Sequence, residues 1–352
     1  MTDLRSLTYP QLEELMKELG QPAYRVGQVF SWLHQKQVSS FDQMTNLPAA
    51  LRRQLAQRCT LSNLTVERKL VSQKDGTVKY LFGLPDGECV ESVLMDYHHG
   101  HSLCISTQVG CRMGCRFCAS TLGGLVRSLT PGEMLGEIYT AGADSGCRID
   151  SVVLMGIGEP LDNFDNVMAF LELLSDPRGL NLSLRHVSLS TCGLVDRIYD
   201  LAERKLGLTL SVSLHAPNDR IRSETMPVNN KWNIDSLLKA CRDYFAATGR
   251  RVSFEYALIQ GKNDTPDHAR ELAARLKGMM CHVNLIPVNP VVERGNRRST
   301  RQAVEQFRKT LQACGVNATV RRELGTDINA ACGQLRRTHA ARPAGESEVP
   351  HD

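Results

Sequence analysis

The sequence predicts an α/β protein in which strands and helices alternate around a partly closed barrel. From His101 onward, six short apolar or β-branched runs are each followed by a stretch with apolar residues at helical spacing. Neighbouring parallel strands require such crossovers, so six β–α units in succession indicate one parallel sheet. In barrels of this kind the loops at the carboxyl ends of the strands carry the functional residues.

Each element of this partial (βα)6 barrel is assigned from its own run of residues. Strands are expected at 101–107, 151–157, 185–191, 208–214, 251–259 and 281–287, with one more candidate at 317–324. Helices are expected at 131–143, 164–176, 195–205, 234–248, 265–278 and 300–315. The barrel core therefore occupies residues 97–330.

The segments around the barrel have a different character. Residues 1–63 place apolar side chains such as Leu12 and Leu19 at helical spacing, which predicts a small helical domain. Between 64 and 96, three β-rich runs are separated by the turn signals KDG and PDG, which predicts an antiparallel extension. The segment 331–352 ends in polar, Pro and Gly residues with little to bury, and we expect a disordered tail there.

Composition narrows the class of protein. The 352 residues carry a net charge of +4, and 42% of them are hydrophobic, which is enough for a sizeable core. No apolar run approaches the roughly 18 residues of a membrane helix, and the start lacks a secretory signal pattern, so we expect a cytoplasmic protein without membrane contact. Twelve cysteines in a reducing compartment do not indicate a disulfide scaffold, so some should bind metal or perform chemistry.

Three of these cysteines directly follow the first barrel strand. The run GCRMGCRFC places Cys111, Cys115 and Cys118 in a C-x3-C-x2-C loop, where three thiolates can reach one metal centre. The alternative is structural zinc, which usually has four ligands, and no fourth Cys or His lies nearby at finger spacing. A [4Fe–4S] cluster held by three cysteines keeps one iron open for a small molecule, so the spacing favours a cluster.

These motifs resemble the radical S-adenosylmethionine (SAM) superfamily. The cysteine loop has Phe117 before its last cysteine, and the next strand ends in MGIGEP, which contains Gly158 and Glu159. The resemblance implies a [4Fe–4S] cluster at the cysteine loop and SAM as the second cofactor, bound through its amino group at this second motif. Glycine lets a backbone approach a ligand closely, and a carboxylate can hold an ammonium group.

A narrower resemblance covers nearly the whole chain. The runs PAYRVGQVFSW, CVESVLM, LCISTQVGC, MGIGEPLDN, LSTCG, SLHAPND, NLIPVNP and DINAACGQL together are similar to the RlmN and Cfr family of RNA adenine methyltransferases. The resemblance implies methylation of adenine C2, at adenine 2503 of 23S rRNA and adenine 37 of tRNA, with two SAM used per methyl group. Cfr-type methylation of C8 in the same ribosomal adenine is the alternative, although GEPL and SLHAPND look closer to RlmN.

The same resemblance implies three catalytic residues. Cys332, in ACGQL, would accept a methyl group from one SAM, because adenine C2 is not nucleophilic enough to take it directly. A second SAM, cleaved reductively, would give a 5′-deoxyadenosyl radical that activates the S-methyl group for addition to the ring. Glu91 would then accept a proton, and Cys104 would release the product by forming a transient disulfide with Cys332.

The remaining expectations concern SAM, RNA and partners. By resemblance, the SAM contacts are Gly158, Glu159, Ser190, Ser213, Leu214, His215 and Asn289. Basic residues that favour phosphate contact are Arg250, Arg251, Arg294, Arg297, Arg298, Arg301, Arg321, Arg322, Arg336 and Arg337. The N-terminal domain, with Tyr24, Arg25 and Trp32, is a further RNA-binding candidate. We expect structured 23S rRNA and tRNA with an extruded adenine, an electron donor such as flavodoxin or ferredoxin, and a monomer.

Two other interpretations stay open at the level of sequence. A radical SAM enzyme with an unrelated substrate is disfavoured by the combination of Glu91, Cys104 and Cys332. An RNA-binding protein with a structural metal would be colourless and contain zinc, whereas a cluster protein is brown and contains iron and sulfide. One departure from the family pattern, Asn329 where Asp is common, removes no catalytic group and concerns only the fine-tuning of the substrate.

Overall fold

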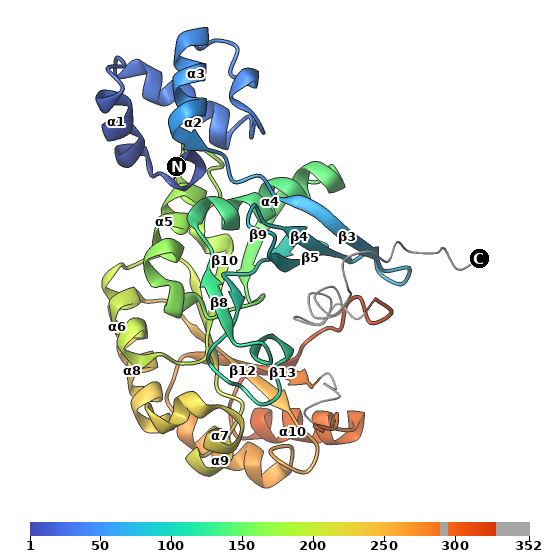
Figure 1. The fold of residues 1–352 in the computed structure, drawn as a ribbon. Helices are drawn as coiled ribbons and strands as arrows, with labels where there is room; N and C mark the ends of the chain where they lie inside the picture. The colour runs from blue at the N-terminus through green and yellow to red at the C-terminus, as the bar shows by residue number, and fades with distance from the viewer. Residues whose placement is uncertain (289–294, 329–352) are drawn as a thin grey trace, which may run out of the picture.

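A computed structural model describes residues 1–288 and 295–328, and its centre is one curved ten-stranded sheet (Figure 1). In spatial order the strands are β14 (Ala318–Val320), β13 (Cys281–Pro287), β12 (Val252–Leu258), β11 (Thr209–Ser213), β10 (Val187–Thr191), β9 (Ile149–Leu154), β6 (Gly100–Cys104), β5 (Cys89–Tyr97), β4 (Val78–Gly83) and β3 (Thr65–Val71). Pairing is parallel from β6 to β14 and antiparallel from β6 to β3. The α/β prediction is confirmed, and the extra candidate at 317–324 contains a seventh parallel strand.

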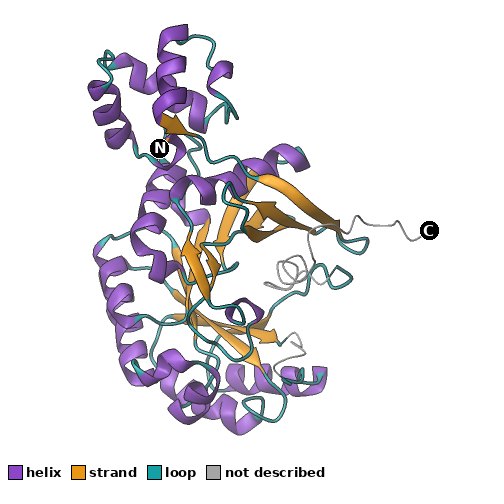
Figure 2. Ribbon diagram, viewed as in Figure 1, coloured by secondary structure: helices purple, strands orange, loops and turns teal. Residues whose placement is uncertain are grey.

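Helices cover the outer side of the curved sheet (Figure 2). They are α4 (Pro131–Ser145), α5 (Phe164–Ser175), α6 (Val195–Glu203), α8 (Ile234–Thr248), α9 (Pro266–Leu276) and α10 (Arg301–Ala313). Local signals set their ends: Thr130 and Glu133 form a capping box at the start of α4, and Gly146 ends it with φ +68°. Within the described residues, no helix combines the length and apolar character needed to span a membrane.

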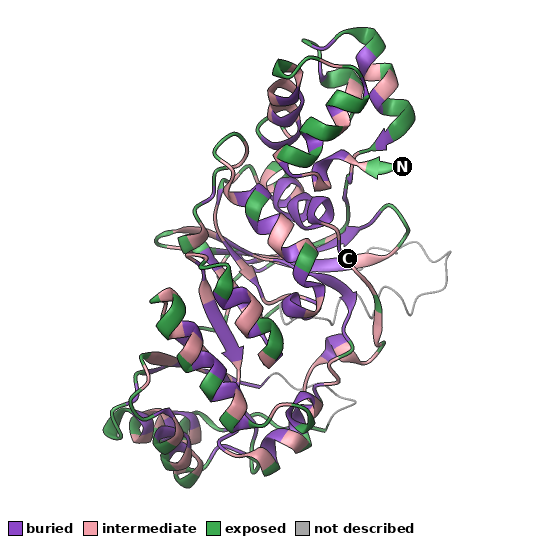
Figure 3. Ribbon diagram, turned by 90° about the vertical axis from the view of Figure 1, so that its left-hand side faces the viewer, coloured by how far each residue is buried: buried purple, intermediate pink, exposed green. Residues whose placement is uncertain are grey.

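Alternation along the strands separates an apolar outer face from a polar inner face. In β10, Val187, Leu189 and Thr191 are buried, whereas Ser188 and Ser190, which alternate with them, are only partly buried. Successive side chains of a strand point to opposite faces, so the apolar residues pack against the helices and the serines face the interior of the barrel. Figure 3 shows the buried strands behind helices whose outer faces are exposed.

Two strands and one α-helix in the described part of the barrel were not expected from the sequence. Strands β7 (Gln108–Gly110) and β8 (Leu125–Ser128) form a small antiparallel hairpin that brackets the cysteine loop. Helix α7 (Asp219–Thr225) follows β11 and is only seven residues long. All three contact the cysteine loop or lie next to it, so they belong to the surroundings of the site.

The N-terminal helices pack onto α4 through a buried polar cluster. These helices are α1 (Tyr9–Glu18), α2 (Tyr24–His34) and α3 (Ala49–Arg58). The short strand β1 (Thr2–Asp3), before α1, pairs with β2 (Cys59–Thr60), which follows α3. The His34 ring is fully buried and its Nδ1 lies 2.9 Å from the Tyr139 hydroxyl of α4. The Arg5 guanidinium lies over the same tyrosine ring, 5.6 Å from its centroid.

The burial of His34 predicts a loss of stability in mild acid. Burial lowers the pKa of His34 to about 3, mainly by desolvation, so the unfolded chain binds a proton that the folded chain does not. Stability is therefore retained above pH 6.5 and falls as the pH drops toward 3, by about 1.4 kcal/mol per pH unit for one proton. In urea unfolding, the free energy of unfolding of His34→Gln should decline less steeply with falling pH than that of the parent protein. The difference between the two proteins at pH 7.5 gives the cost of the lost packing. Equal slopes in the two proteins would contradict this assignment.

Candidate active site

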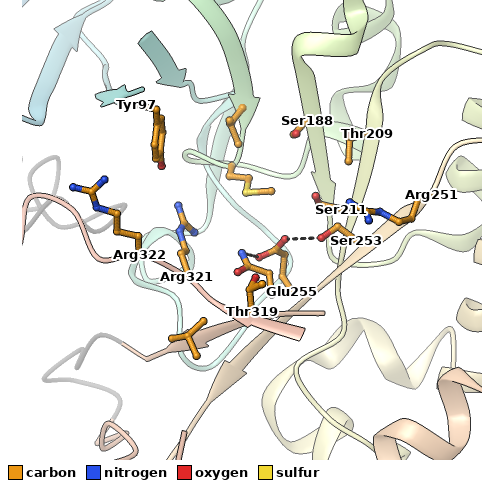
Figure 4. Close-up of a pocket in the computed structure, with 14 residues that line it drawn as sticks. Tyr97, Ser188, Thr209, Ser211, Arg251, Ser253, Glu255, Thr319, Arg321 and Arg322 are labelled. Carbon is orange, nitrogen blue, oxygen red and sulfur yellow. Dashed lines mark hydrogen bonds between the residues drawn. The ribbon is translucent and has the colours of Figure 1, made fainter. Parts of the chain in front are cut away.

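The inner face of the sheet lines a cavity of about 400 Å³ (Figure 4). The strand registers align Val93 of β5, Cys104, Val153, Ser188 and Thr209 in one row across five strands. Directly opposed residues on neighbouring strands point to the same face. The last three residues of the row line the cavity, so Cys104 and Val93 face the same side.

The cavity is polar and carries arginines at its edge. The Glu255 carboxylate accepts hydrogen bonds from Asn284 Nδ2 at 2.8 Å and from Ser253 Oγ at 3.4 Å. Burial raises the pKa of Glu255, while the hydrogen bonds and the nearby Arg321 oppose the rise. Arg251 and Arg321 both line the cavity, and Figure 4 shows Arg321 pointing into it. Such a lining suits a polar ligand with anionic groups.

The cysteine loop is held on two sides by backbone hydrogen bonds. Cys111 N donates to Gly124 O of the β7–β8 connection at 2.8 Å, and Arg116 N donates to Thr225 O at the end of α7 at 2.8 Å. Gly110 must be glycine, because its φ is +79° and a Cβ there would lie 2.0 Å from Gly124 O. The loop conformation is therefore fixed by the surrounding protein.

The three thiols belong to one fixed loop, and their donor set fits a cluster. Cys111 and Cys115 are 7% and 8% exposed, and burial raises both pKa values, that of Cys111 to about 12. All three thiols belong to the one loop that these backbone hydrogen bonds hold in place. In the part of the chain that the structure describes, no three His, Cys, Asp or Glu side chains converge on one ion position. Three thiolates from one loop are the donor set of a [4Fe–4S] cluster that keeps one iron open.

The two glycines of MGIGEP allow β9 to pack against the segment that follows β6. A Cβ on Gly156 would lie 2.5 Å from Ile105 O, and one on Gly158 would lie 2.7 Å from Gln108 Cβ. Gly158 also has φ +111°, which side chains rarely adopt. Protein atoms fill the space beside both residues. Close packing of the chain therefore requires glycine at both positions, with or without a bound ligand.

Glu159 is fixed at the centre of this arrangement. The residue is 3% exposed, and its two carboxylate oxygens accept hydrogen bonds from Leu161 N at 3.1 Å and Cys192 N at 2.7 Å. Burial raises the pKa of Glu159, and the hydrogen bond from Cys192 is the main opposing effect. Each carboxylate oxygen can accept more than one hydrogen bond, so the group keeps capacity for an ammonium ligand.

We expect Gly158→Ala to displace Glu159. The new Cβ meets Gln108 and Thr107 at 2.7–2.8 Å at a backbone angle of φ +111°, so the variant should lose about 1–3 kcal/mol of stability from backbone strain, with steric overlap adding to the loss. SAM binding, measured by calorimetry, should weaken. Gly146→Ala is the matched control, because Gly146 also has positive φ but nothing within 4 Å of a Cβ. If both variants bind SAM like the parent, the packing argument fails.

The ends of β10 and β11 bring the other expected SAM contacts to the same edge. Ser190 pairs with Ser211 in the register, and Ser213 pairs with Glu255. Leu214 directly follows and is fully buried. The structure thus brings Ser190, Ser213 and Leu214 to neighbouring strand ends, as expected for a barrel mouth.

His215 connects this edge to the cysteine loop. Its ring meets Phe117 edge to face with centroids 4.8 Å apart, and its Nδ1 accepts a hydrogen bond from Ala257 N at 2.9 Å. Burial lowers the pKa of His215 to about 3, so the ring is neutral and its Nε2 carries the proton. The backbone of His215 has φ +56°, an uncommon conformation held in place by Asn263, which donates to His215 O at 2.8 Å.

Glu91 lies on the cavity side of β5, two residues before Val93. Its carboxylate is 3.0 Å from Lys79 Nζ on β4, and the two side chains are 2% and 1% exposed. Burial raises the pKa of Cys104 to about 11, and the charge of Glu91 contributes to the rise. The structure therefore brings Glu91 and Cys104 together and adds Lys79, which reads in the sequence as an ordinary strand lysine.

Several expected residues lie outside the described part of the chain. They are Asn289, Arg294, Asn329, Cys332, Arg336 and Arg337. The chain shortly before Cys332 is nevertheless attached to the β3–β4 turn. Ser72 Oγ donates to the Asp327 carboxylate at 2.7 Å, and Gly325 N donates to Asp75 Oδ2 at 2.9 Å.

Comparisons with known proteins agree with this geometry. A family model described as Ribosomal RNA large subunit methyltransferase N-terminal domain matches residues 2–61, and the Radical SAM superfamily model matches 105–275. Probable dual-specificity RNA methyltransferase RlmN of Alkaliphilus oremlandii is 54% identical over 96% of this chain and 98% of its own length. The protein of the same name from Pelotomaculum thermopropionicum is 55% identical over 95% and 91%.

A solved structure extends the likeness to three dimensions. The crystal structure of a radical SAM methyltransferase from Sphaerobacter thermophilus has a TM-score of 0.90 and 43% sequence identity, and the match covers 95% of this chain and 99% of that one. Identity above one half along nearly the full length exceeds what a shared fold alone produces. The chain belongs to the RlmN family of the radical SAM superfamily.

Proposed function

We propose that this protein methylates C2 of adenine in 23S rRNA and in tRNA. The observation that carries the proposal is the full-length similarity to RlmN proteins, supported by Glu91 and Cys104 lying on the same face of the neighbouring strands β5 and β6. The names of these relatives favour C2 chemistry over the Cfr-type reaction at C8. Ribosomal and transfer RNA as substrates would place the enzyme in the cytoplasm. We further propose that it works as a monomer and receives electrons from a donor such as flavodoxin or ferredoxin.

The proposed domains follow the segments of the chain. Residues 1–63 would be an RNA-binding accessory domain, 64–96 a β extension, and 97–330 the catalytic barrel. Residues 331–352 would carry the reactive Cys332.

This chain contains residues suited to bind the two cofactors of the superfamily. Cys111, Cys115 and Cys118 would hold a [4Fe–4S] cluster, and Glu159 would hold the amino group of SAM. Ser190, Ser213, Leu214 and His215 would line the same ligand, with Asn289 as a further contact. When bound, the cluster supplies the electron that starts radical chemistry on SAM.

The later steps of the reaction would be carried out by the protein's own residues. Cys332 accepts a methyl group on its sulfur and later carries the carbon that joins adenine. Glu91 accepts a proton from the adduct, and Lys79 holds the Glu91 carboxylate in place. Cys104, as a thiolate, attacks the sulfur of Cys332: an S–S bond forms, the C–S electron pair passes to the adenine-bound carbon, and that carbon takes up a proton to become the methyl group. A cytosolic thiol reductant then reduces the disulfide. Asp327 is bound to the β3–β4 turn, and an extended chain spans at most about 3.5 Å per residue, so the five residues to Cys332 set its greatest distance from that turn.

Arginines at the cavity should contact the RNA backbone. We expect Arg321→Gln and Arg322→Gln to weaken RNA binding and to lower the salt slope of the binding constant by about one for each phosphate that the protein no longer neutralises. Filter binding at several salt concentrations gives this slope. Arg197→Gln is the control, because Arg197 lies on the outer helix α6, paired with Asp200 at 2.8 Å. Equal slopes in all variants would place the RNA elsewhere.

Substrate choice is tested with separate RNAs. The reconstituted protein is incubated anaerobically with SAM, a reductant and either a 23S rRNA fragment or a tRNA anticodon stem–loop. Methyl transfer to both RNAs is expected, and an RNA in which the target adenine is replaced should accept none. Cleavage of SAM without methylation of either RNA would contradict the proposal.

A further inference from the structure

Arg222 of α7 is a fully buried cation with only neutral hydrogen-bond partners. Its Nη2 donates to Cys192 O at 2.6 Å and to Ser213 O at 3.2 Å, its Nε donates to Leu214 O at 3.1 Å, and its Nη1 donates to Asn229 Oδ1 at 3.0 Å. Three of these acceptors are backbone carbonyls at the ends of β10 and β11. The side chain therefore lies beneath the strand ends that form the candidate SAM site.

The charge of Arg222 has no carboxylate partner at ion-pair distance among the residues the structure describes. Asn229 bridges Arg222 to Asp219, because its Oδ1 accepts from Arg222 and its Nδ2 donates to Asp219 Oδ1 at 3.0 Å; Asp219 makes no direct ion pair with Arg222. Glu159 is bound to the N–H of Cys192, whereas Arg222 is bound to its carbonyl group. A buried charge is costly unless an opposite charge compensates it, so this site calls for an anion nearby.

The cysteine loop is the neighbour that can provide this anion. Thr225, in the same helix turn as Arg222, accepts a hydrogen bond from Arg116 N inside the loop. Arg116 directly follows Cys115, so this hydrogen bond holds the helix turn that carries Arg222 against the loop, next to that thiol. A cluster held by three thiolates brings negative charge to this position and takes up more of it on reduction.

We propose that Arg222 is the counter-charge of the iron–sulfur cluster and raises its reduction potential. The proposal rests on the assignment of Cys111, Cys115 and Cys118 to the cluster. Reduction adds one negative charge to the site, and a fixed buried cation stabilises the reduced form more than the oxidised form. Arg222 acts through the cluster and not on the substrate, so it is a positioning residue for the electron-transfer step.

A purely structural role is the competing explanation, because the guanidinium also ties two strand ends together. The two roles separate when charge and hydrogen-bond geometry are changed independently. Arg222→Lys keeps the charge and loses the planar fork of donors, whereas Arg222→Gln and Arg222→Met lose the charge. Arg5→Met is the matched control, because Arg5 is also buried and bonded to two backbone carbonyls, Ser62 O at 2.6 Å and Val38 O at 2.8 Å, but lies in the N-terminal region.

The test is a redox titration of the anaerobically reconstituted full chain, followed by electron paramagnetic resonance of the reduced cluster. We expect a more negative midpoint potential in Arg222→Gln and Arg222→Met, and a midpoint near that of the parent in Arg222→Lys and Arg5→Met. An unchanged midpoint in the two neutral variants, with parental iron and sulfide content, would overturn the proposal.

Loss of cluster binding is also informative. If the neutral variants fold, by circular dichroism and thermal unfolding, but do not retain iron while Arg222→Lys does, the counter-charge is supported. If Arg222→Lys fails in the same way, hydrogen-bond geometry is what the site needs and the proposal is wrong. A cluster that persists in Cys115→Ala would instead show that the cysteine assignment, and not the role of Arg222, is at fault.

Discussion

Cys115→Ala is expected to abolish cluster binding and every later step of the reaction. Cys115 is the middle thiol of the loop, is 8% exposed, and lies in a segment that the β7–β8 hairpin and α7 hold in place. Loss of one of three ligands leaves too few thiolates for a cubane with one open iron. The purified variant should be colourless, contain little iron or sulfide, and form no 5′-deoxyadenosine from SAM.

Cys241→Ala provides the control for this result. Cys241 is a fully buried thiol on α8, outside the cysteine loop, so its removal costs packing but no metal ligand. This variant should keep the brown colour and parental SAM cleavage. A Cys115→Ala protein that still cleaves SAM would exclude the loop as the cluster site.

Glu91→Gln is expected to stop product formation while SAM cleavage continues. Glutamine has nearly the same shape but cannot accept the proton, and loss of a general base typically costs about 10²–10⁴-fold in rate. Lys79→Met should also reduce product, because it removes the ammonium that lies 3.0 Å from the buried carboxylate. Breaking a buried pair in this way also costs roughly 3–5 kcal/mol of stability, so both quantities need to be measured.

Partial reactions distinguish a chemical role from a folding defect in these variants. Release of 5′-deoxyadenosine and methylation of Cys332 should persist in Glu91→Gln, and only RNA methylation should fail. Lys69→Met is the control for Lys79→Met, since Lys69 is a lysine of the neighbouring strand β3 paired with Asp144 at 2.7 Å and is 37% exposed. Full product formation by Glu91→Gln would remove Glu91 from the mechanism without affecting the family assignment.

The order of strands and helices could be predicted from the sequence because each element has its own hydrophobic pattern. The runs that became β9 to β13 are β-branched and short, and the helices that follow them have clear capping residues such as Asn233 and Thr265. Helix α7 was missed because DRIRSET has one strongly apolar residue in seven and no measurable periodicity. The hairpin strands β7 and β8 are three and four residues long, too short for an alternating pattern.

The site residues also differ in whether the sequence alone could identify them. Sequence motifs identify Cys104 and Glu91, but they do not show that both residues face one cavity. That fact follows from the pairing of Val93 with Cys104 in the sheet. Lys79 and Arg222 could not be found from the sequence, because their significance depends on long-range contacts. An exposed lysine or arginine looks the same in sequence as one that is 1% or 0% exposed, and only the fold distinguishes them.

Nucleoside mass spectrometry tests the central claim most directly. RNA from the anaerobic reaction with the 23S rRNA fragment is digested to nucleosides and compared with standards of 2-methyladenosine and 8-methyladenosine. The proposed chemistry predicts 2-methyladenosine at the target adenine and no 8-methyladenosine. Formation of 8-methyladenosine, or of no methylated adenosine by protein that holds its cluster and cleaves SAM, would contradict it.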